Sequence, residues 1–285
     1  GGRYQKIKKE MNLDYYFNPI NVQANPVFEF DEKNNWNTFL PKIAISKKFD
    51  DKLTTYTSVS KGYLPGGYNN FASSGTEDDN RFDAQTSINY EVGVKDSFLN
   101  DNLTLAASIF YLDIEDIHVY STDRTTGMMY TSNAGEADSK GVELELAYSI
   151  NNNWKVDTSI GVMKARYSNY IDSNLEDNKN NKIERTPSHS ANIGLSYYSN
   201  GGLYGRFDVQ NQGDMFFNAQ NSLKQDSYTV ANAKIGYLFD DFDIYTYAKN
   251  ITDENYIVAL EEMAEFRQLT YGKGRFIGAG IKYSF

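Results

Sequence analysis

Cysteine is absent from this sequence of 285 residues. Its absence excludes disulfide frameworks, thiolate metal sites and cysteine nucleophiles. The sequence also lacks any run of about 18 apolar residues, which excludes a transmembrane helix. Positive charge is scarce, since 28 Lys and Arg residues stand against 38 Asp and Glu residues, for a formal net charge of -10. A nucleic-acid partner is therefore excluded, because no basic surface is available to meet phosphates.

Proline is rare, and we expect none of its occurrences to fall in the middle of a strand, as a sheet requires. The five prolines are Pro19, Pro26, Pro41, Pro65 and Pro187. A signal-like segment is also missing from the start, where the chain opens on two glycines without a methionine. We expect Gly1 to be a cut or fragment boundary.

Aromatic residues, in contrast, are abundant: 23 tyrosines and 17 phenylalanines. Many of them lie in segments where apolar and polar residues alternate, which is the pattern of a strand with one apolar face. In "GVELELAY", Val142 and Leu144 face one way while Glu143 and Glu145 face the other. The pattern recurs from end to end and predicts roughly twelve strands. Only "ALEEMAEF" (259–266) is a candidate for one or two helical turns.

The connections between these strands alternate strictly between short and long. Short ones are predicted around 49–52, 98–102, 150–153, 199–202 and 239–242, and long ones at about 63–86, 114–139, 167–187, 212–227 and 251–273, with a further long one at 13–37. A membrane β-barrel has short periplasmic turns and long extracellular loops. A soluble all-β protein, the alternative, has no reason for this separation.

The two strand faces agree with a barrel, because the outside needs an apolar row and the lumen tolerates charge. The predicted lumen-facing residues are Glu143, Glu145, Lys155 and Asp157. Aromatic side chains prefer the boundary between water and lipid. The predicted girdle residues are Trp36, Tyr56, Tyr111, Tyr148, Trp154, Tyr245 and Tyr283.

Several segments resemble TonB-dependent outer-membrane receptors, in the order of that family. They are "YTSVSKGYLPGGYN" (56–69), "NYEVGVKDSFLNDNLTLAASIFYLDIEDIHVY" (89–120), "SNAGEADSKGVELELAY" (132–148) and "AKNITDENY" (248–256). The passage 89–148 is most similar to siderophore receptors of the yersiniabactin and pesticin type.

The resemblance implies an all-β, antiparallel, up-and-down transmembrane barrel, of which residues 1–285 supply about twelve C-terminal strands out of 22. Neither a plug domain nor a TonB box is visible, so we expect a fragment of a receptor. A closed 12-stranded barrel is the alternative. The resemblance also assigns Ile281, Tyr283 and the terminal Phe285 as the signal read by the barrel assembly machinery. On this interpretation Phe285 is a natural C-terminus.

The function implied by the resemblance is TonB-dependent uptake of a ferric siderophore across the bacterial outer membrane. Expected partners are outer-membrane lipid, the TonB complex acting through the missing plug, the assembly machinery and the iron–siderophore ligand. Haem or cobalamin is the alternative to the siderophore as the transported ligand. No resident cofactor, metal or enzymatic activity is expected. The rivals are a passive porin or small structural barrel, and a soluble carbohydrate-binding or adhesive β-protein.

Ligand binding is expected from the long loops, where arginine and aromatic side chains suit anionic or aromatic siderophore complexes. The candidates are Tyr68, Arg81, Tyr120, Arg124, Tyr130, Phe216, Phe217 and Arg267. For each of them the alternative is a residue that packs the loop or faces water.

For the other residues that could bind a metal or act in catalysis, we expect a structural role or simple exposure to water. His118 and His189 are surface histidines rather than haem or metal ligands. The acidic stretch 172–184 lacks the glycine and spacing of an EF-hand, which indicates a solvated loop. The spacing of Glu143 and Glu145 shows only that they share a face, so we expect no catalytic pair.

Overall fold

The computed structural model describes residues 1–16, 26, 28–69, 80–122, 129–172, 175–263 and 266–284. Its main element is a 12-stranded antiparallel sheet. In spatial order the strands are β1 (Gly2–Tyr15), β2 (Phe28–Lys48), β3 (Thr54–Leu64), β6 (Gln85–Phe98), β7 (Leu103–Glu115), β10 (Glu136–Ser149), β11 (Trp154–Asn169), β12 (His189–Tyr198), β13 (Leu203–Gln212), β16 (Tyr228–Phe239), β17 (Phe242–Lys249) and β20 (Phe276–Tyr283). Within these ranges, no helix is long and apolar enough to cross a membrane.

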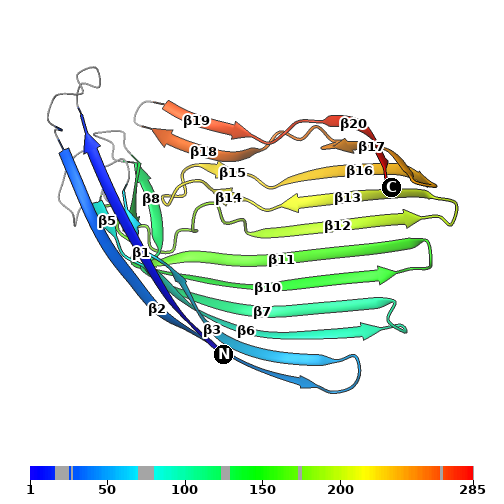
Figure 1. Cartoon of the computed structure of the whole chain (residues 1–285), viewed down its shortest axis with the longest axis horizontal. Coiled ribbons are helices and arrows are strands. Elements are labelled where there is room, and N and C mark those ends of the chain that lie inside the picture. The colour runs from blue at the N-terminus through cyan, green and yellow to red at the C-terminus, as the bar shows by residue number, and fades with distance from the viewer. Residues whose placement is uncertain are drawn as a thin grey trace.

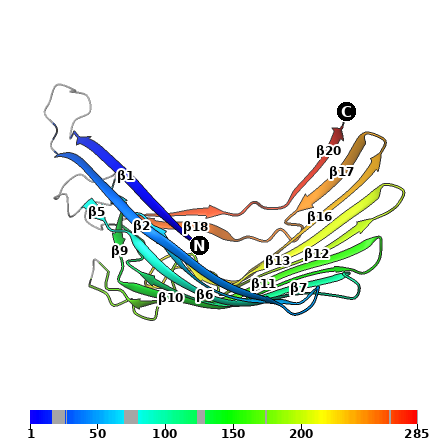
Figure 2. The same ribbon diagram turned by 60° about the horizontal axis from the view of Figure 1, so that its bottom comes forward.

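The sheet curves into a trough, with β1 and β20 at opposite edges (Figure 2). Every strand pairs with the next long strand along the chain, as in an up-and-down meander. Short turns join the strands at one end, and the long connections with their small strands gather at the other (Figure 1). The predicted strand count of the sheet and the alternation of short and long connections are confirmed. The bounds of the first long connection, predicted at 13–37, are wrong, because β1 continues to Tyr15 and β2 already begins at Phe28.

The helical interpretation of 259–266 is wrong. Residues Ile257–Met263 form β18, which pairs with β19 (Phe266–Tyr271) in a hairpin. Leu260 of β18 is buried against Met215 and Phe217 of another loop. Apolar contacts from outside the segment therefore override its helical propensity.

The prediction for proline is also wrong at one position, because Pro41 lies inside β2. The neighbouring Lys42 amide donates to Gly1, so the nitrogen of Pro41 points toward β3 instead. On that side the ladder begins only at the Lys42–Ser60 pair. Proline is tolerated here because no ladder hydrogen bond needs its missing N–H.

The convex face of the trough carries the apolar rows. Ile109, Val142 and Val162 lie directly opposite one another on β7, β10 and β11, and all three are exposed. The last strand follows the same pattern, since Ile277 and Ile281 pair with Ala248 and Ile244 of β17. Such a row satisfies the requirement of a lipid-facing surface.

The concave face is polar and contains repeated pairs of tyrosine and glycine on neighbouring strands. A Cβ atom at Gly280 would lie 2.6 Å from the ring of Tyr245, and one at Gly93 would lie 2.4 Å from the ring of Tyr56. The tyrosine rings therefore lie across strand positions that only glycine leaves open. These rings fill the inner surface where larger residues on both strands would collide.

The girdle prediction is wrong for Trp36, Tyr56 and Tyr245, because a girdle residue must lie on the convex face. Tyr111, Tyr148 and Trp154 lie on the convex face with the apolar rows. Tyr56 and Tyr245 lie on the concave face, above glycines. The remaining residues are Trp36, which also points to the concave side, and Tyr283, which shares the outer face of the last strand.

Candidate functional site

Four small hairpins stand at the loop end of the sheet. They are formed by β4 (Gly67–Tyr68) with β5 (Arg81–Phe82), β8 (His118–Thr122) with β9 (Met129–Asn133), β14 (Met215–Phe216) with β15 (Lys224–Gln225), and β18 with β19. We call these hairpins, with the connection 170–187, the loop wall.

The first two hairpins are tied together by hydrogen bonds between side chains and backbone. The amide of Asn69 donates to the carbonyl of Thr131 at 3.0 Å and accepts from its N–H at 2.7 Å. Asn133 accepts from the N–H of Asp83 at 2.7 Å. His118 places Nε2 at 2.7 Å from the Asp83 carbonyl and its ring edge-on to Phe82. These contacts fix one hairpin relative to the other.

An apolar cluster anchors the β8–β9 hairpin to the concave face of the sheet. Val119 of β8 is buried with Ala137 of β10 and Tyr167 of β11. The Tyr167 hydroxyl donates to the carboxylate of Glu184. Because Ala219 joins the same cluster, the packing extends to the loop that follows β13. The hairpin is therefore folded inward over the sheet.

Polar contacts join the connection 170–187 to the β14–β15 loop. The Lys182 ammonium lies 2.7 Å from the carboxylate of Asp214, which also accepts from the Ser188 hydroxyl at 2.6 Å. These two donors hold the pKa of Asp214 below its usual range. The amide of Asn221 donates to the Lys182 carbonyl at 2.9 Å.

A second apolar cluster joins the β14–β15 and β18–β19 hairpins. It contains Met215, Phe217 and Leu223 from one hairpin and Leu260 from the other. The Ile257 N–H also donates to the side chain of Gln225 at 2.8 Å. The four hairpins thus form a continuous packed structure along the loop end.

The candidates Tyr68 and Arg81 face each other across the β4–β5 ladder. The Tyr68 ring packs edge-on against Phe30 and Trp36, with centroids 5.5 and 5.9 Å away. The Nζ atom of Lys9 lies 5.7 Å from the Trp36 ring centre.

Phe30, Trp36 and Lys9 were not among the predicted site residues. Phe30 and Trp36 belong to β2 and Lys9 to β1, so the sequence offers no local signal that links them to Tyr68. The Lys9–Trp36 contact has cation–π geometry, which holds the Lys9 side chain against the Trp36 ring.

The candidates Tyr120 and Tyr130 lie on opposite faces of the β8–β9 hairpin, because Tyr120 pairs with Thr131. Val119 points into the buried cluster, so Tyr120 points away from the sheet and is 69% exposed. Tyr130 is half-buried. Tyr120 is therefore the candidate best placed to contact a ligand in the interior.

The remaining candidates are dispersed. Phe216 lies beneath the Lys182 ammonium, whose Nζ is 5.5 Å from the ring centre. Phe217 is buried in the second apolar cluster, where it packs the loop. Arg267 lies exposed on β19. Arg124 lies outside the described residues.

The predicted lumen residues all lie on the concave face. Glu143 and Glu145 are exposed on β10, and Lys155 is exposed on β11. Asp157 binds Arg206 through two hydrogen bonds of 2.7 and 2.9 Å. Arg206 also donates to Asp208 at 2.9 Å, so one guanidinium serves two carboxylates.

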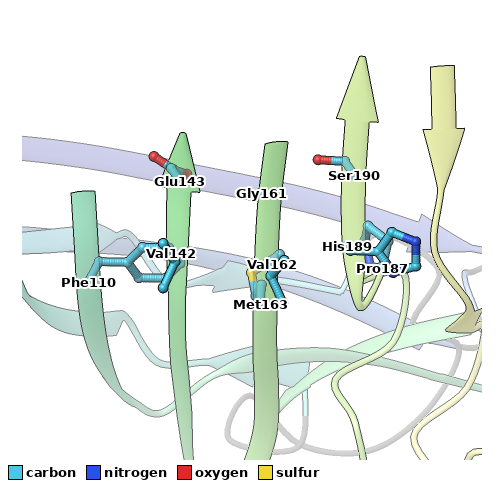
Figure 3. Close-up of a pocket in the computed structure, with 9 residues that line it drawn as sticks. All are labelled: Phe110, Val142, Glu143, Gly161, Val162, Met163, Pro187, His189 and Ser190. Atoms are coloured by element: carbon cyan, nitrogen blue, oxygen red, sulfur yellow. The ribbon is translucent and has the colours of Figure 1, made fainter. Parts of the chain in front are cut away.

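A shallow depression interrupts this face at Gly161 (Figure 3). The carboxylate of Glu143 and the hydroxyl of Ser190 project from the strands on either side of the glycine (Figure 3). A Cβ atom at Gly161 would meet only the Ser190 Oγ, at 3.4 Å. Glu143 is therefore accessible from the interior.

Replacement of Arg206 by glutamine is expected to lower the free energy of unfolding by about 1–2 kcal/mol, because it leaves two carboxylates facing each other. The cost is below that of a fully buried pair, since the Arg206 side chain is 38% exposed. Urea unfolding in lipid vesicles would measure it. Lys155→Gln, on the same face, serves as control, and adding Asp157→Asn should restore part of the stability. An unchanged midpoint for Arg206→Gln would contradict the assignment.

Both histidines contact neighbouring polar groups, His118 the Asp83 carbonyl and His189 the Asn211 side chain, at 2.7 and 2.8 Å. In the acidic stretch, Asp172 accepts from the Glu176 N–H at 3.0 Å. Across the described ranges, no group of three or more His, Asp or Glu side chains could hold a metal ion.

Comparison with known proteins agrees with this architecture. The family model described as TonB dependent receptor-like, beta-barrel matches residues 1–251. The pesticin receptor of Yersinia pestis is 31% identical over 237 residues, which cover 82% of this chain and 34% of the relative. The catecholate siderophore receptor Fiu of Escherichia coli K12 is 24% identical over 253 residues, which cover 85% of this chain and 32% of the relative.

Among solved structures, the ferric yersiniabactin uptake receptor FyuA from Yersinia pestis superposes with a TM-score of 0.83 at 24% identity, covering 100% of this chain and 42% of that chain. The chain spans about a third of the length of the curated relatives it matches. Its localisation is that of the family, the bacterial outer membrane. With a matched model over residues 1–251 and the twelve-stranded meander described above, the chain belongs to the TonB-dependent receptor β-barrel family.

Proposed function

We propose that the chain forms part of the barrel wall and the loop wall of a receptor for TonB-dependent uptake of a ferric siderophore. The observation that carries the proposal is the loop wall itself, whose hairpins are packed against one another and present Tyr120 toward the interior. Relatives named as receptors for pesticin, catecholate siderophores and ferric yersiniabactin support the same class of ligand.

The binding surface in this proposal combines aromatic and cationic side chains. Tyr68 forms one part, supported by the buried Trp36 ring and by Lys9 over that ring, and Tyr120 with Arg267 contributes from other hairpins. Aromatic rings stack on flat ligand groups, and cationic groups form charge-assisted hydrogen bonds with anionic ones. Ferric siderophores often offer both features.

The remaining steps in this proposal involve other components. We assign energy coupling to TonB acting through a plug, and membrane insertion to the assembly machinery reading the C-terminal strand. The protein is a transporter in this proposal and catalyses no reaction. Ile281 and Tyr283 lie on the outer face of β20, while Phe285 lies outside the described residues.

The test is growth of an iron-starved strain on single ferric siderophores, with and without the full-length gene and with and without TonB. Growth that requires both supports the proposal. Ion conductance in bilayers together with TonB-independent growth would favour a porin instead.

Tyr120→Ala in the full-length receptor is expected to weaken binding of the siderophore that supports growth by about tenfold, as for a central aromatic contact. Tyr198→Ala is the matched control, because Tyr198 is 52% exposed at the opposite, turn end of the sheet. Fluorescence titration measures both. Equal affinities of the two variants would remove Tyr120 from the binding surface.

A further inference from the structure

On the convex face, residues that lie directly opposite one another across neighbouring strands form a level of the sheet. One such level, at the loop end of the apolar surface, is polar. Tyr90, Tyr111, Lys140 and Lys164 lie directly opposite one another on the adjacent strands β6, β7, β10 and β11. We call these four residues the lysine row. Both lysines are exposed, and the two tyrosine rings lie 6.4 Å apart.

The next level toward the turns is apolar. It consists of Val92, Ile109, Val142 and Val162, whose exposed fractions are 59, 64, 49 and 55%. Two residues along a strand correspond to roughly 6.6 Å, so the ammonium groups lie immediately beyond this apolar surface. Tyrosine and lysine at that height are typical of the boundary between hydrocarbon and headgroups. Because the long loops mark the extracellular end, this boundary belongs to the outer leaflet.

The two lysines have no counter-ion among the residues that the structure describes. Neither Lys140 nor Lys164 forms an ion pair among the described residues. They are direct cross-strand neighbours, and like charges in that relation destabilise a sheet. The carboxylate of Asp138, one level nearer the loops, accepts from the Ser168 hydroxyl at 3.2 Å and lies opposite Arg166.

We propose that the lysine row binds the phosphate group of a phosphorylated lipid of the outer leaflet. Cross-strand Cβ atoms lie about 5 Å apart, so the two ammonium groups can converge on one phosphate. The tyrosine hydroxyls of the same level are additional donors. The acyl chains then run along the apolar level formed by Ile109, Val142 and Val162.

The charges on the neighbouring levels favour this height for the headgroup. One level nearer the loops, Asp113 and Asp138 lie between Lys61 and Arg166, so that level carries no net charge, whereas the lysine row carries two positive charges. The apolar level on the other side excludes a phosphate placed deeper. A free phosphate ion gains nothing from the apolar level, which favours a lipid over a soluble anion.

The test uses the full-length receptor, purified in detergent and titrated with a bis-phosphorylated outer-leaflet glycolipid while bound lipid is counted by native mass spectrometry. Lys140→Gln/Lys164→Gln is expected to weaken retention about tenfold. Lys155→Gln/Lys282→Gln, which removes two lysines from the concave face, should leave it unchanged. Equal retention by both double variants would overturn the proposal.

Two further arms identify the ligand. The dephosphorylated glycolipid should bind the unmodified receptor as weakly as the phosphorylated form binds Lys140→Gln/Lys164→Gln, and equal binding of both lipids to the unmodified receptor would refute a phosphate site. Inorganic phosphate at 10 mM, roughly a hundredfold above the lipid, should fail to displace it; displacement would show a free-anion site instead. Lys140→Arg/Lys164→Arg should retain the lipid, which separates charge from misfolding.

Discussion

Replacement of Leu144 by arginine is expected to lower the free energy of unfolding by about 2–4 kcal/mol, the cost of a charge on the lipid face near the bilayer midplane. Leu144 lies on the convex face between Ala107 and Ile160, in the middle of the apolar rows. Urea unfolding in lipid vesicles measures the change, and the folded fraction in outer membranes gives the same ranking in cells.

Ala147→Arg is the matched control, because Ala147, three positions along the same strand, points to the opposite face. Ala147 is exposed on the concave side and lies directly opposite Asp157. An arginine there remains hydrated and approaches a carboxylate, so we expect a cost of about 0–1 kcal/mol. Similar costs for the two variants would mean that the faces of β10 are assigned the wrong way round.

The faces of β10 could be predicted from the sequence because its alternation is clean. Val142, Leu144 and Leu146 alternate with two glutamates, and only one assignment keeps the charges out of lipid. The order of short and long connections was equally informative. Both features depend on residues close together in the chain, which is why strand count and topology followed from them.

The faces of the tyrosines do not follow from the sequence, because tyrosines lie on both faces of the sheet. The preference of aromatic residues for the lipid boundary predicts an outer position for Tyr245 and Tyr56, but each covers a glycine on the neighbouring strand of the concave face. The partner of each ring is fixed by strand register, which the alternation of a single strand does not contain.

The loop wall was the least predictable part. The hydrogen bonds between Asn69 and Thr131 join residues 62 positions apart, and Leu260 buries the candidate Phe217 from a different hairpin. A phenylalanine in a long loop looks the same in sequence whether it packs another loop or faces a ligand. Contacts between loops decide the difference, and they leave no periodic pattern.

Gly280→Ala is the second change with a large expected effect. The added methyl group would lie 2.6 Å from the Tyr245 ring, whose face also holds the Lys234 ammonium at 4.0 Å. The ring must therefore move and lose that contact, at a cost of about 1–3 kcal/mol from overpacking. Heat-modifiable mobility on gels and urea unfolding both report the loss of folded barrel.

Gly161→Ala provides the comparison, since the same methyl group there meets only Ser190 Oγ at 3.4 Å. Because alanine also restricts the unfolded chain, this variant should match or exceed the original stability by up to about 1 kcal/mol. Adding Tyr245→Ala to Gly280→Ala should recover part of the loss, because it removes the colliding ring. If Gly280→Ala and Gly161→Ala behave alike, the Tyr245 ring does not lie over Gly280 as described.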